Sequence, residues 1–281
     1  MGLQSFIHKI KIGFARKSEP AIPNTTDAKR YGSCGEDQLV RGILLRLPEV
    51  RIKKNIIIQT AEGKAEIDCL ALYRGKLFAI EIKRWRGVLV DQGDQFVQYK
   101  KDRWTEDIYQ KAYRSPFRQL NRAIYLLKKQ IPERVWINGI VFFAEADSIR
   151  TDSKGVWFDD IDDLIEYMTQ SGREAWEHSA ESFFERCISA DRLYSHKWGD
   201  SLYAIVCEPS VRFSTPNGVL TKRELSSITI KHHWCYDDLH IKKRNGESLV
   251  LQVENGSVYV NEHGTNRRYA LSKLDYIEFG G

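Results

Sequence analysis

The chain has 281 residues, of which 42% are hydrophobic and 29% charged, a balance that excludes a disordered protein and allows one large domain or two of ordinary size. Its net charge of +5 is modest, and no apolar run approaches the roughly 20 residues that cross a bilayer. The five cysteines are widely spaced without a CxxC pair, which predicts reduced thiols and a cytoplasmic location rather than a disulfide framework.

The first 30 residues are predicted to form a short helix and a linker. Residues 1–17 are basic, with apolar residues at near-helical spacing, which favours an amphipathic helix packed on the protein. A helix that binds anionic lipid is the alternative. Residues 18–30 contain two prolines among Asn and Thr, a composition typical of a linker.

The next segment, 31–170, is predicted to be an α/β domain. A helical pattern over Gly35–Leu47 precedes three predicted strands, at residues 50–60, Ala65–Tyr73 and Lys76–Lys83. Ser115 and Pro116 suit the N-cap and first position of a second helix, and Trp136–Ala144 is a candidate buried strand. The order helix, three strands, helix, strand predicts a mixed central sheet flanked by helices.

The pattern changes after Trp198. Residues 161–168 and 173–193 are predicted to be helical, so that residues 171–197 form a connecting helix. Residues 198–281 show short strands, which predicts a small β-rich domain of unknown role. Three Asn-Gly pairs predict tight hairpins there: Asn217-Gly218, Asn245-Gly246 and Asn255-Gly256.

Charge is distributed unevenly between these segments. Residues 98–134 contain ten Lys/Arg and four Asp/Glu, whereas residues 198–281 contain ten of each. The basic segment is expected to face phosphates, although a solvated helix face would look the same. A neutral β-rich domain is expected to bind a protein partner or regulator rather than DNA.

Three residues of the predicted strands carry the main chemical signal. Residues two apart on a strand share a face, so Glu81 and Lys83 point the same way. If Arg74-Gly75 is a two-residue hairpin loop, Asp68 lies directly across from Glu81. Two like charges in that position repel each other, and a divalent cation between them would remove the repulsion.

A third acidic residue lies at the start of the first helical stripe. Glu36 lies on the same helical face as Leu39, Ile43 and Leu47. A carboxylate at the start of a core-facing stripe predicts a charged partner or a metal nearby, although it could simply favour the helix N-terminus.

These residue types suit phosphodiester hydrolysis. Carboxylate oxygens suit Mg²⁺, with Mn²⁺ as a substitute, and the bound metal can acidify a water and neutralise developing charge. A neighbouring lysine can orient the attacking water, or act as a base if its pKa is lowered.

Four blocks of the sequence resemble the nuclease-related domain (NERD) of the PD-(D/E)XK nuclease superfamily. They cover residues 31–145 in a matching order and are 32–36 (GSCGE), 66–68 (EID), 80–87 (IEIKRWRG) and 115–119 (SPFRQ). Two departures from the family pattern, Ile82 for valine and Ser115 for asparagine, remove no functional group.

The resemblance implies a restriction-endonuclease-like fold and a role for each matching residue. Asp68, Glu81 and the backbone carbonyl of Ile82 are implied as metal ligands, and Lys83 as the residue that positions water. Glu36 is implied as an acidic helper and Gln119 as a polar contact from the later helix.

The predicted activity is a Mg²⁺-dependent DNA endonuclease, with defence against foreign DNA as its setting; RNA and exonuclease activity stay open. The expected nucleic-acid contacts are Arg84, Trp85, Arg114, Arg118 and Arg122. Trp85 either stacks on a base or packs against the core. The alternative is a nucleic-acid-binding or partner-regulated protein whose main functional part is the β-rich domain. The oligomeric state is not predicted.

Overall fold

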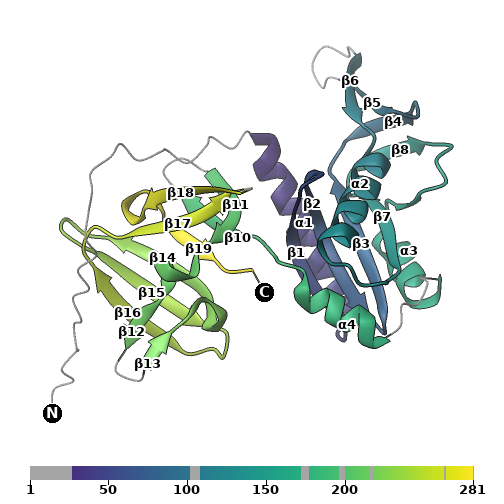
Figure 1. Cartoon of the computed structure of the whole chain (residues 1–281). Coiled ribbons are helices and arrows are strands. Elements are labelled where there is room, and N and C mark those ends of the chain that lie inside the picture. Colours follow the sequence, from purple (N-terminus) through teal and green to yellow (C-terminus); the bar gives the residue numbers. More distant parts are fainter. Residues whose placement is uncertain are drawn as a thin grey trace. The chain divides into compact units, whose positions relative to one another are not determined.

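The computed structural model describes residues 27–101, 108–171, 177–195, 200–215, 218–262 and 264–280 (Figure 1). The chain divides into two compact units, Asp27–Ile188, the N-terminal unit, and a C-terminal unit that contains Ser189–Gly281. The helix expected in residues 1–17 lies outside the described residues. Helix α1 begins at Asp27, so the last residues of the predicted linker are helical instead.

A mixed five-stranded sheet forms the centre of the N-terminal unit, with strand order β1-β2-β3-β7-β9. Strand β2 is antiparallel to both β1 and β3, whereas β3, β7 and β9 run parallel to one another. Their bounds are Arg51–Thr60, Gly63–Tyr73, Lys76–Lys83, Ile137–Phe143 and Val156–Phe158. The predicted α/β class with a mixed central sheet is therefore confirmed.

Helices cover both faces of this sheet (Figure 1). The two helices on one face are α2 (Pro116–Gln130) and α4 (Glu177–Arg186), and those on the other are α1 (Asp27–Arg46) and α3 (Ile161–Glu166), which continues into a π-helical turn. Side chains alternate between the two faces of each strand and so contribute to two separate hydrophobic cores. On β3, Leu77 and Ala79 pack on the α2 side, and Phe78 and Ile80 on the α1 side.

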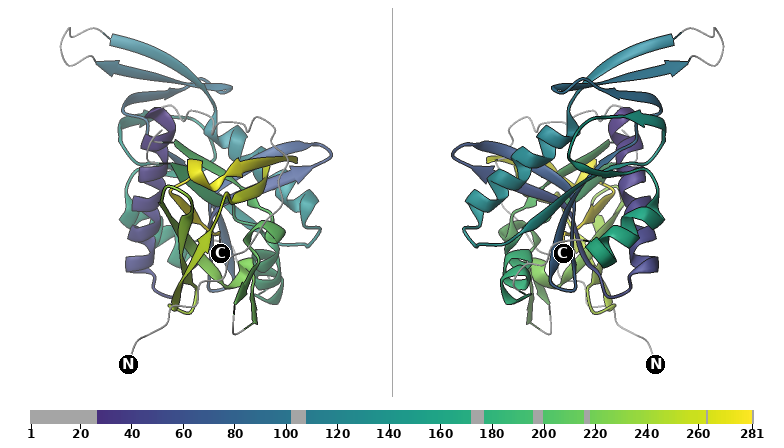
Figure 2. Two further views of the ribbon diagram at one scale, coloured as in Figure 1. Left: turned by 90° about the vertical axis from the view of Figure 1, so that its left-hand side faces the viewer. Right: turned by 90° about the vertical axis from the view of Figure 1, so that its right-hand side faces the viewer.

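A second sheet of four strands, in the order β6-β5-β4-β8, was not predicted. The strands span Gly87–Asp91 (β4), Gln95–Lys101 (β5), Ile108–Arg114 (β6) and Ala146–Arg150 (β8). Strand β6 is exposed at nearly every position, so it lacks the apolar alternation that marks a half-buried strand. The β5–β6 hairpin projects away from the central sheet (Figures 1 and 2).

The helix predicted for residues 173–193 is wrong at its end. Helix α4 ends at Arg186, and Asp191–Ser195 forms strand β10. Helical spacing ends at Cys187, the last residue of this segment in the α2-side core. From Asp191 buried and half-buried residues alternate, which is the period of a strand. The two units accordingly divide at Ser189, before the predicted boundary at residue 198.

The C-terminal unit is β-rich, as predicted, and its main sheet has the order β16-β15-β14-β19-β10-β11-β17-β18. The remaining bounds are Asp200–Val206 (β11), Phe213–Thr215 (β12), Gly218–Leu220 (β13), Leu225–His232 (β14), Asp237–Lys243 (β15), Ser248–Val253 (β16), Ser257–Glu262 (β17), Thr265–Ala270 (β18) and Tyr276–Glu278 (β19). None of the helices in the described ranges is long and apolar enough to cross a membrane.

Two of the three predicted Asn-Gly hairpins are present. Strands β12 and β13 pair across residues 216–217, and Asn245-Gly246 joins β15 to β16. Asn255-Gly256 does not form a hairpin, because β16 and β17 are not neighbours in the sheet. It is instead a change of direction, in which Asn255 has a positive φ of 52° and the Gly256 carbonyl accepts from the Leu271 amide at 2.9 Å.

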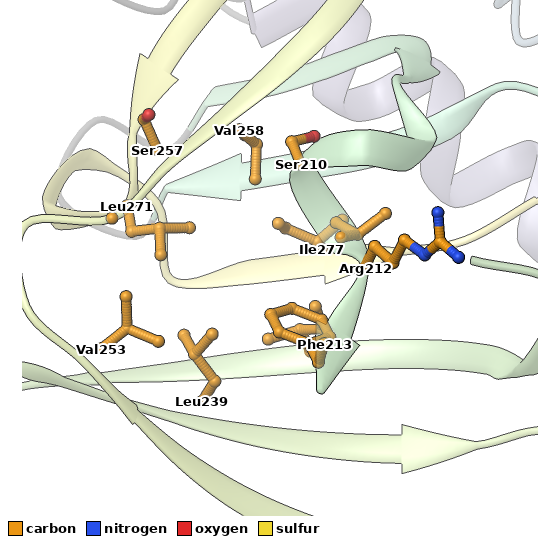
Figure 3. A pocket seen from close by; sticks show the side chains of 12 residues that line it. Ser210, Arg212, Phe213, Leu239, Val253, Ser257, Val258, Leu271 and Ile277 are labelled. Atoms are coloured by element: carbon orange, nitrogen blue, oxygen red, sulfur yellow. The ribbon is translucent and has the colours of Figure 1, made fainter. Parts of the chain in front are cut away.

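The core of the C-terminal unit contains a small cavity of about 50 Å³ (Figure 3). Its wall is mainly apolar and includes Ile228, Leu239, Val258 and Ile277. Arg212 and two serine hydroxyls are its polar lining, and no lining residue is an acid, a histidine or a cysteine. This lining offers neither metal ligands nor a general base. The acidic residues predicted in the N-terminal unit, Asp68 and Glu81, are therefore the candidates for chemistry.

A buried ion pair fixes the first strand of the C-terminal unit. Asp191 is fully buried and accepts from the backbone amides of Val206 at 2.6 Å and Gly280 at 3.0 Å. Lys222 donates to the same carboxylate. Burial raises the pKa of Asp191, and Lys222 and the two amides oppose that rise. The carboxylate therefore joins β10, β11 and the end of the chain.

Lys222→Ala is expected to destabilise the C-terminal unit by about 2–4 kcal/mol, because it leaves a buried carboxylate without its counter-ion. Urea unfolding of the full chain, followed by hydrogen exchange of β10 and β11, measures this. Lys242→Ala, on the exposed face of β15, is the matched control and should cost less than about 0.5 kcal/mol. Equal effects of the two substitutions would contradict the assigned role.

Candidate active site

The β2–β3 turn sets the register of the candidate site. Arg74 and Gly75 have positive φ values of 48° and 72°, as a two-residue type I′ turn requires. Tyr73 therefore pairs with Lys76, and the same register continues to the pair Cys69 and Ile80. This is the register that the sequence predicts.

The backbone pairing of β2 and β3 ends at Cys69 and Ile80. Beyond that pair, the side chain of Asp68 makes the hydrogen bond to β3. The Asp68 Oδ2 atom accepts a hydrogen bond from the Ile82 amide at 2.7 Å. The carboxylate thus points toward β3 and occupies the place of a missing main-chain acceptor. Asp68 is held close to Glu81 by this contact.

Glu81 lies in the α2-side row of β3 and is fully buried. Lys83, two residues further along that row, donates from Nζ to Glu81 Oε1. The other carboxylate oxygen, Oε2, is buried and has no hydrogen-bond partner among the described residues. A buried carboxylate oxygen without a partner is costly, and a cation would satisfy it.

The electrostatics of the cluster follow from this burial. Burial raises the pKa of Glu81 to about 7, aided by Asp68 and opposed by Lys83. Burial also raises the pKa of Asp68 against the pull of Lys83 and the Ile82 amide. Burial would lower the pKa of Lys83, but Glu81 and Asp68 outweigh it and raise that pKa. Lys83 is therefore an ammonium in the metal-free protein, which favours its orienting role over that of a base.

Glu36 joins the cluster from α1. Burial, with contributions from Asp68 and Glu66, raises the pKa of Glu36 to about 8. Asp68 and Glu66 are therefore close enough to affect the titration of Glu36, and its role as an acidic helper stays a prediction. Lys54 opposes the rise and also binds Asp37 on α1 at 2.9 Å.

Asn55 is a feature of the site that the sequence analysis missed. It has a positive φ of 50°, is only 6% exposed, and lies opposite Asp68 in the β1–β2 register. Lys54 reaches α1 on one face of the sheet, whereas Ile56 packs in the α2-side core. Strand β1 therefore turns over at Asn55. The signal in the sequence is an asparagine, which tolerates this conformation, before three isoleucines.

The segment after β3 is held in place by its own contacts. Arg84 Nε donates to Glu145 at 2.7 Å. Trp85 stacks on Tyr113 of β6, with ring centroids 4.4 Å apart and planes at 21°, and packs against the α2-side core. The Lys83 Nζ atom lies 5.9 Å from the Trp85 ring centroid. Core packing of Trp85, one of the two alternatives from the sequence, is therefore present.

The other predicted contacts lie on exposed surfaces. Arg118 pairs with Asp94, and Arg122 donates to the Glu62 carbonyl at 3.0 Å. Arg114 is exposed at the end of β6. Gln119 is exposed on α2, and no described hydrogen bond joins its side chain to the carboxylates. Its catalytic role stays a prediction.

The cluster fits a metal that takes few protein ligands. Within the described residues, no group of three or more His, Cys, Asp or Glu side chains is placed to hold a metal ion. Asp68 and Glu81 supply two carboxylates, one with the unpartnered Oε2. Mg²⁺ suits such a pair because it keeps several waters. The Ile82 carbonyl stays a predicted ligand.

Comparisons with known proteins give one family match and one similar solved structure. Residues 32–144, which lie within the N-terminal unit, match the model of the nuclease-related domain (NERD), the family that the sequence was found to resemble. The crystal structure of a protein of unknown function, AF1548, aligns with 58% of this chain and 69% of its own at 14% identity, with a TM-score of 0.24. No curated protein matches the chain.

The raised carboxyl pKa values predict how stability depends on pH. A carboxyl group with a raised folded-state pKa contributes stability that is complete below its ordinary pKa and is lost as pH rises through the folded value. For Glu36 and Glu81 this window runs from 4.5 to about 8. The metal-free protein is therefore expected to lose stability across it.

Thermal unfolding in EDTA at several pH values measures this loss. Glu81→Gln and Glu36→Gln should each flatten the slope, whereas Asp147→Asn, on the exposed part of β8, should keep it. Mg²⁺ should raise the midpoint more at pH 8 than at pH 5, because only the ionised pair binds it. A midpoint that rises with pH in EDTA would contradict the buried cluster.

Proposed function

We propose that the N-terminal unit is a metal-dependent nuclease that hydrolyses phosphodiester bonds in DNA. The observation that carries the proposal is the pair of half-buried Asp68 and fully buried Glu81, with one ammonium, Lys83, and one carboxylate oxygen of Glu81 that has no partner among the described residues. The family match supports a nuclease-related function for the same residues. Endonuclease cleavage, and defence against foreign DNA as its setting, belong to this proposal.

Each residue of the cluster has a proposed role. Asp68 and Glu81, with the Ile82 carbonyl, hold Mg²⁺ or Mn²⁺, which acidifies water and neutralises phosphate charge. The Lys83 ammonium orients the attacking water and offsets the charge that develops on the phosphate. Glu36 acts as an acidic helper from α1, and Gln119 as a polar contact from α2.

Basic side chains near the cluster are proposed to bind the DNA backbone. Arg114 is exposed at the base of the β5–β6 hairpin, and Arg118 and Arg122 lie on the exposed face of α2. Their present partners are surface groups, Asp94 and the Glu62 carbonyl. Exchange of such exposed contacts for phosphates costs little, because surface ion pairs contribute weakly to stability.

The C-terminal unit is proposed to bind a protein partner or regulator. Trp234, in the turn between β14 and β15, is 100% exposed, and next to it His233 stacks on Tyr236 with ring centroids 4.5 Å apart. Aromatic residues are favoured at the centres of protein interfaces. This surface supports the alternative in which partner binding controls the chain.

Asp68→Asn and Glu81→Gln are each expected to abolish cleavage while the fold persists, because each keeps the side-chain shape and loses the charge that holds the metal. Lys83→Ala should lower the rate by at least about a hundredfold, in the range of a lost positioned catalytic group, with a smaller effect on metal affinity. Asp147→Asn, far along the chain on exposed β8, is the matched control. Supercoiled DNA with Mg²⁺ is the substrate, and calorimetry measures metal affinity.

The choice of substrates separates the finer parts of the proposal. Nicking of closed circles marks an endonuclease, whereas activity on linear ends alone marks an exonuclease. Single-stranded DNA and RNA, incubated in parallel, test the preference for duplex DNA. Wild-type cleavage that survives excess EDTA, or that survives Glu81→Gln, would overturn the metal-dependent mechanism.

A further inference from the structure

The β5–β6 hairpin is a ribbon whose base packs on the N-terminal unit and whose outer end has no third strand beside it within the described residues. Its strands pair from Gln95 and Arg114 at the base to Lys101 and Ile108 at the outer end. Strand β4 accompanies β5 only as far as Tyr99. The outer part is therefore two-stranded, and it projects from the unit in both views of Figure 2.

Both faces of this ribbon meet solvent. Every residue of β6 except the half-buried Tyr113 is exposed, including Ile108 at 68% and Tyr109 at 56%. A two-stranded hairpin alone is only marginally stable, and large exposed apolar side chains mark interaction sites. The ribbon is thus a candidate for contact with a partner.

Charge defines the chemistry of that partner. The two strands contain four basic residues and no acidic one, Lys100, Lys101, Lys111 and Arg114, and with residues 102–107 the whole hairpin keeps a net charge of +2. A basic ribbon with interspersed tyrosines complements a polyanion that also has flat or apolar groups, which describes a nucleic acid. An apolar protein surface would not require this charge.

One face of the ribbon leads to the catalytic cluster. Directly paired residues share a face, and the pairs on this face are Lys100 with Tyr109, Gln98 with Lys111, and Phe96 with Tyr113. Tyr113 stacks on Trp85, whose ring lies 5.9 Å from the Lys83 ammonium. The exposed lysines therefore follow a continuous row of side chains to the residue proposed to orient the attacking water.

We infer that the β5–β6 ribbon is an arm that enters the major groove of B-form DNA and guides the duplex to the Asp68–Glu81 cluster. The major groove of B-form DNA admits a two-stranded ribbon, whereas that of A-form RNA is too narrow. The ribbon therefore selects duplex DNA over duplex RNA. This inference deepens the proposed nuclease function and rests on it.

The test measures binding without cleavage. Fluorescence anisotropy in EDTA compares one sequence as a DNA duplex, an RNA duplex and a DNA single strand. Lys100→Ala with Lys111→Ala should weaken binding of the DNA duplex by about ten- to a hundredfold, the range of one full charge-assisted contact, because both lysines are exposed and their contacts are screened by salt. The slope of log affinity against log salt should become shallower by about 2. Binding of the RNA duplex should be weak and unchanged.

The matched control is Lys231→Ala with Lys242→Ala, which removes two exposed strand lysines from the C-terminal unit. It should leave DNA affinity within about twofold. Both double variants replace exposed side chains, so unchanged circular dichroism and thermal midpoints are expected. If the control pair costs more affinity than the ribbon pair, the arm is overturned. Equal losses on DNA duplex, RNA duplex and single strand would overturn groove entry.

A small substrate separates this inference from the nuclease proposal. Bis(p-nitrophenyl) phosphate is too short to reach both the cluster and the arm. The ribbon variant should hydrolyse it at the wild-type rate with Mg²⁺ while its DNA binding is impaired. Hydrolysis without any effect of the ribbon lysines on DNA binding would overturn the arm alone. No hydrolysis of any phosphodiester by the wild type would overturn the nuclease proposal, whatever the binding results.

Discussion

Glu81 is fully buried and Asp68 is half-buried, with Lys83 as their shared cation, and the N-terminal unit is arranged around these three charges. Desolvation by burial raises the pKa of both carboxyl groups; Asp68 adds to the rise at Glu81, and Lys83 opposes the rise at both. The β2–β3 register, the turnover of β1 at Asn55 and the burial beneath α2 all hold the groups in this unfavourable state. Preorganised polar sites of this kind are typical of catalysis, because the cost is met during folding rather than during reaction.

The parts of this arrangement that the sequence predicted depend on local chemistry. The Arg74-Gly75 turn fixes the register as far as the pair Cys69 and Ile80, and its continuation by one residue brings Asp68 across from Glu81. Helix α2 could also be predicted from the sequence, because Pro116 marks its start and a regular apolar stripe marks its buried face. Both inferences use neighbours along one hairpin or one helix.

The parts that the sequence did not predict depend on contacts between distant segments. At Asn55 the side chains of β1 change face. This change can be recognised only from the contacts of β1 with α1 on one face and with the end of α4 on the other. Strand β6 has no buried face that could produce a pattern. Strand β10 closely follows a helix, so its alternation of buried and half-buried residues is hard to recognise in the sequence. The strand is held in place by the hydrogen bonds of Asp191 to distant residues. In each case the deciding interaction is remote in sequence.

The position of β4, β5 and β6 within the chain has a consequence for how such a protein diversifies. All three lie between β3 and β7, which are parallel neighbours and need a long connection in any case. Lengthening a connection that already exists costs little loop-closure entropy. Insertions, deletions and substitutions can therefore change the length and the charge of the ribbon while β2 and β3 keep their pairing. Selection on substrate choice and selection on chemistry can thus act on separate stretches of one gene.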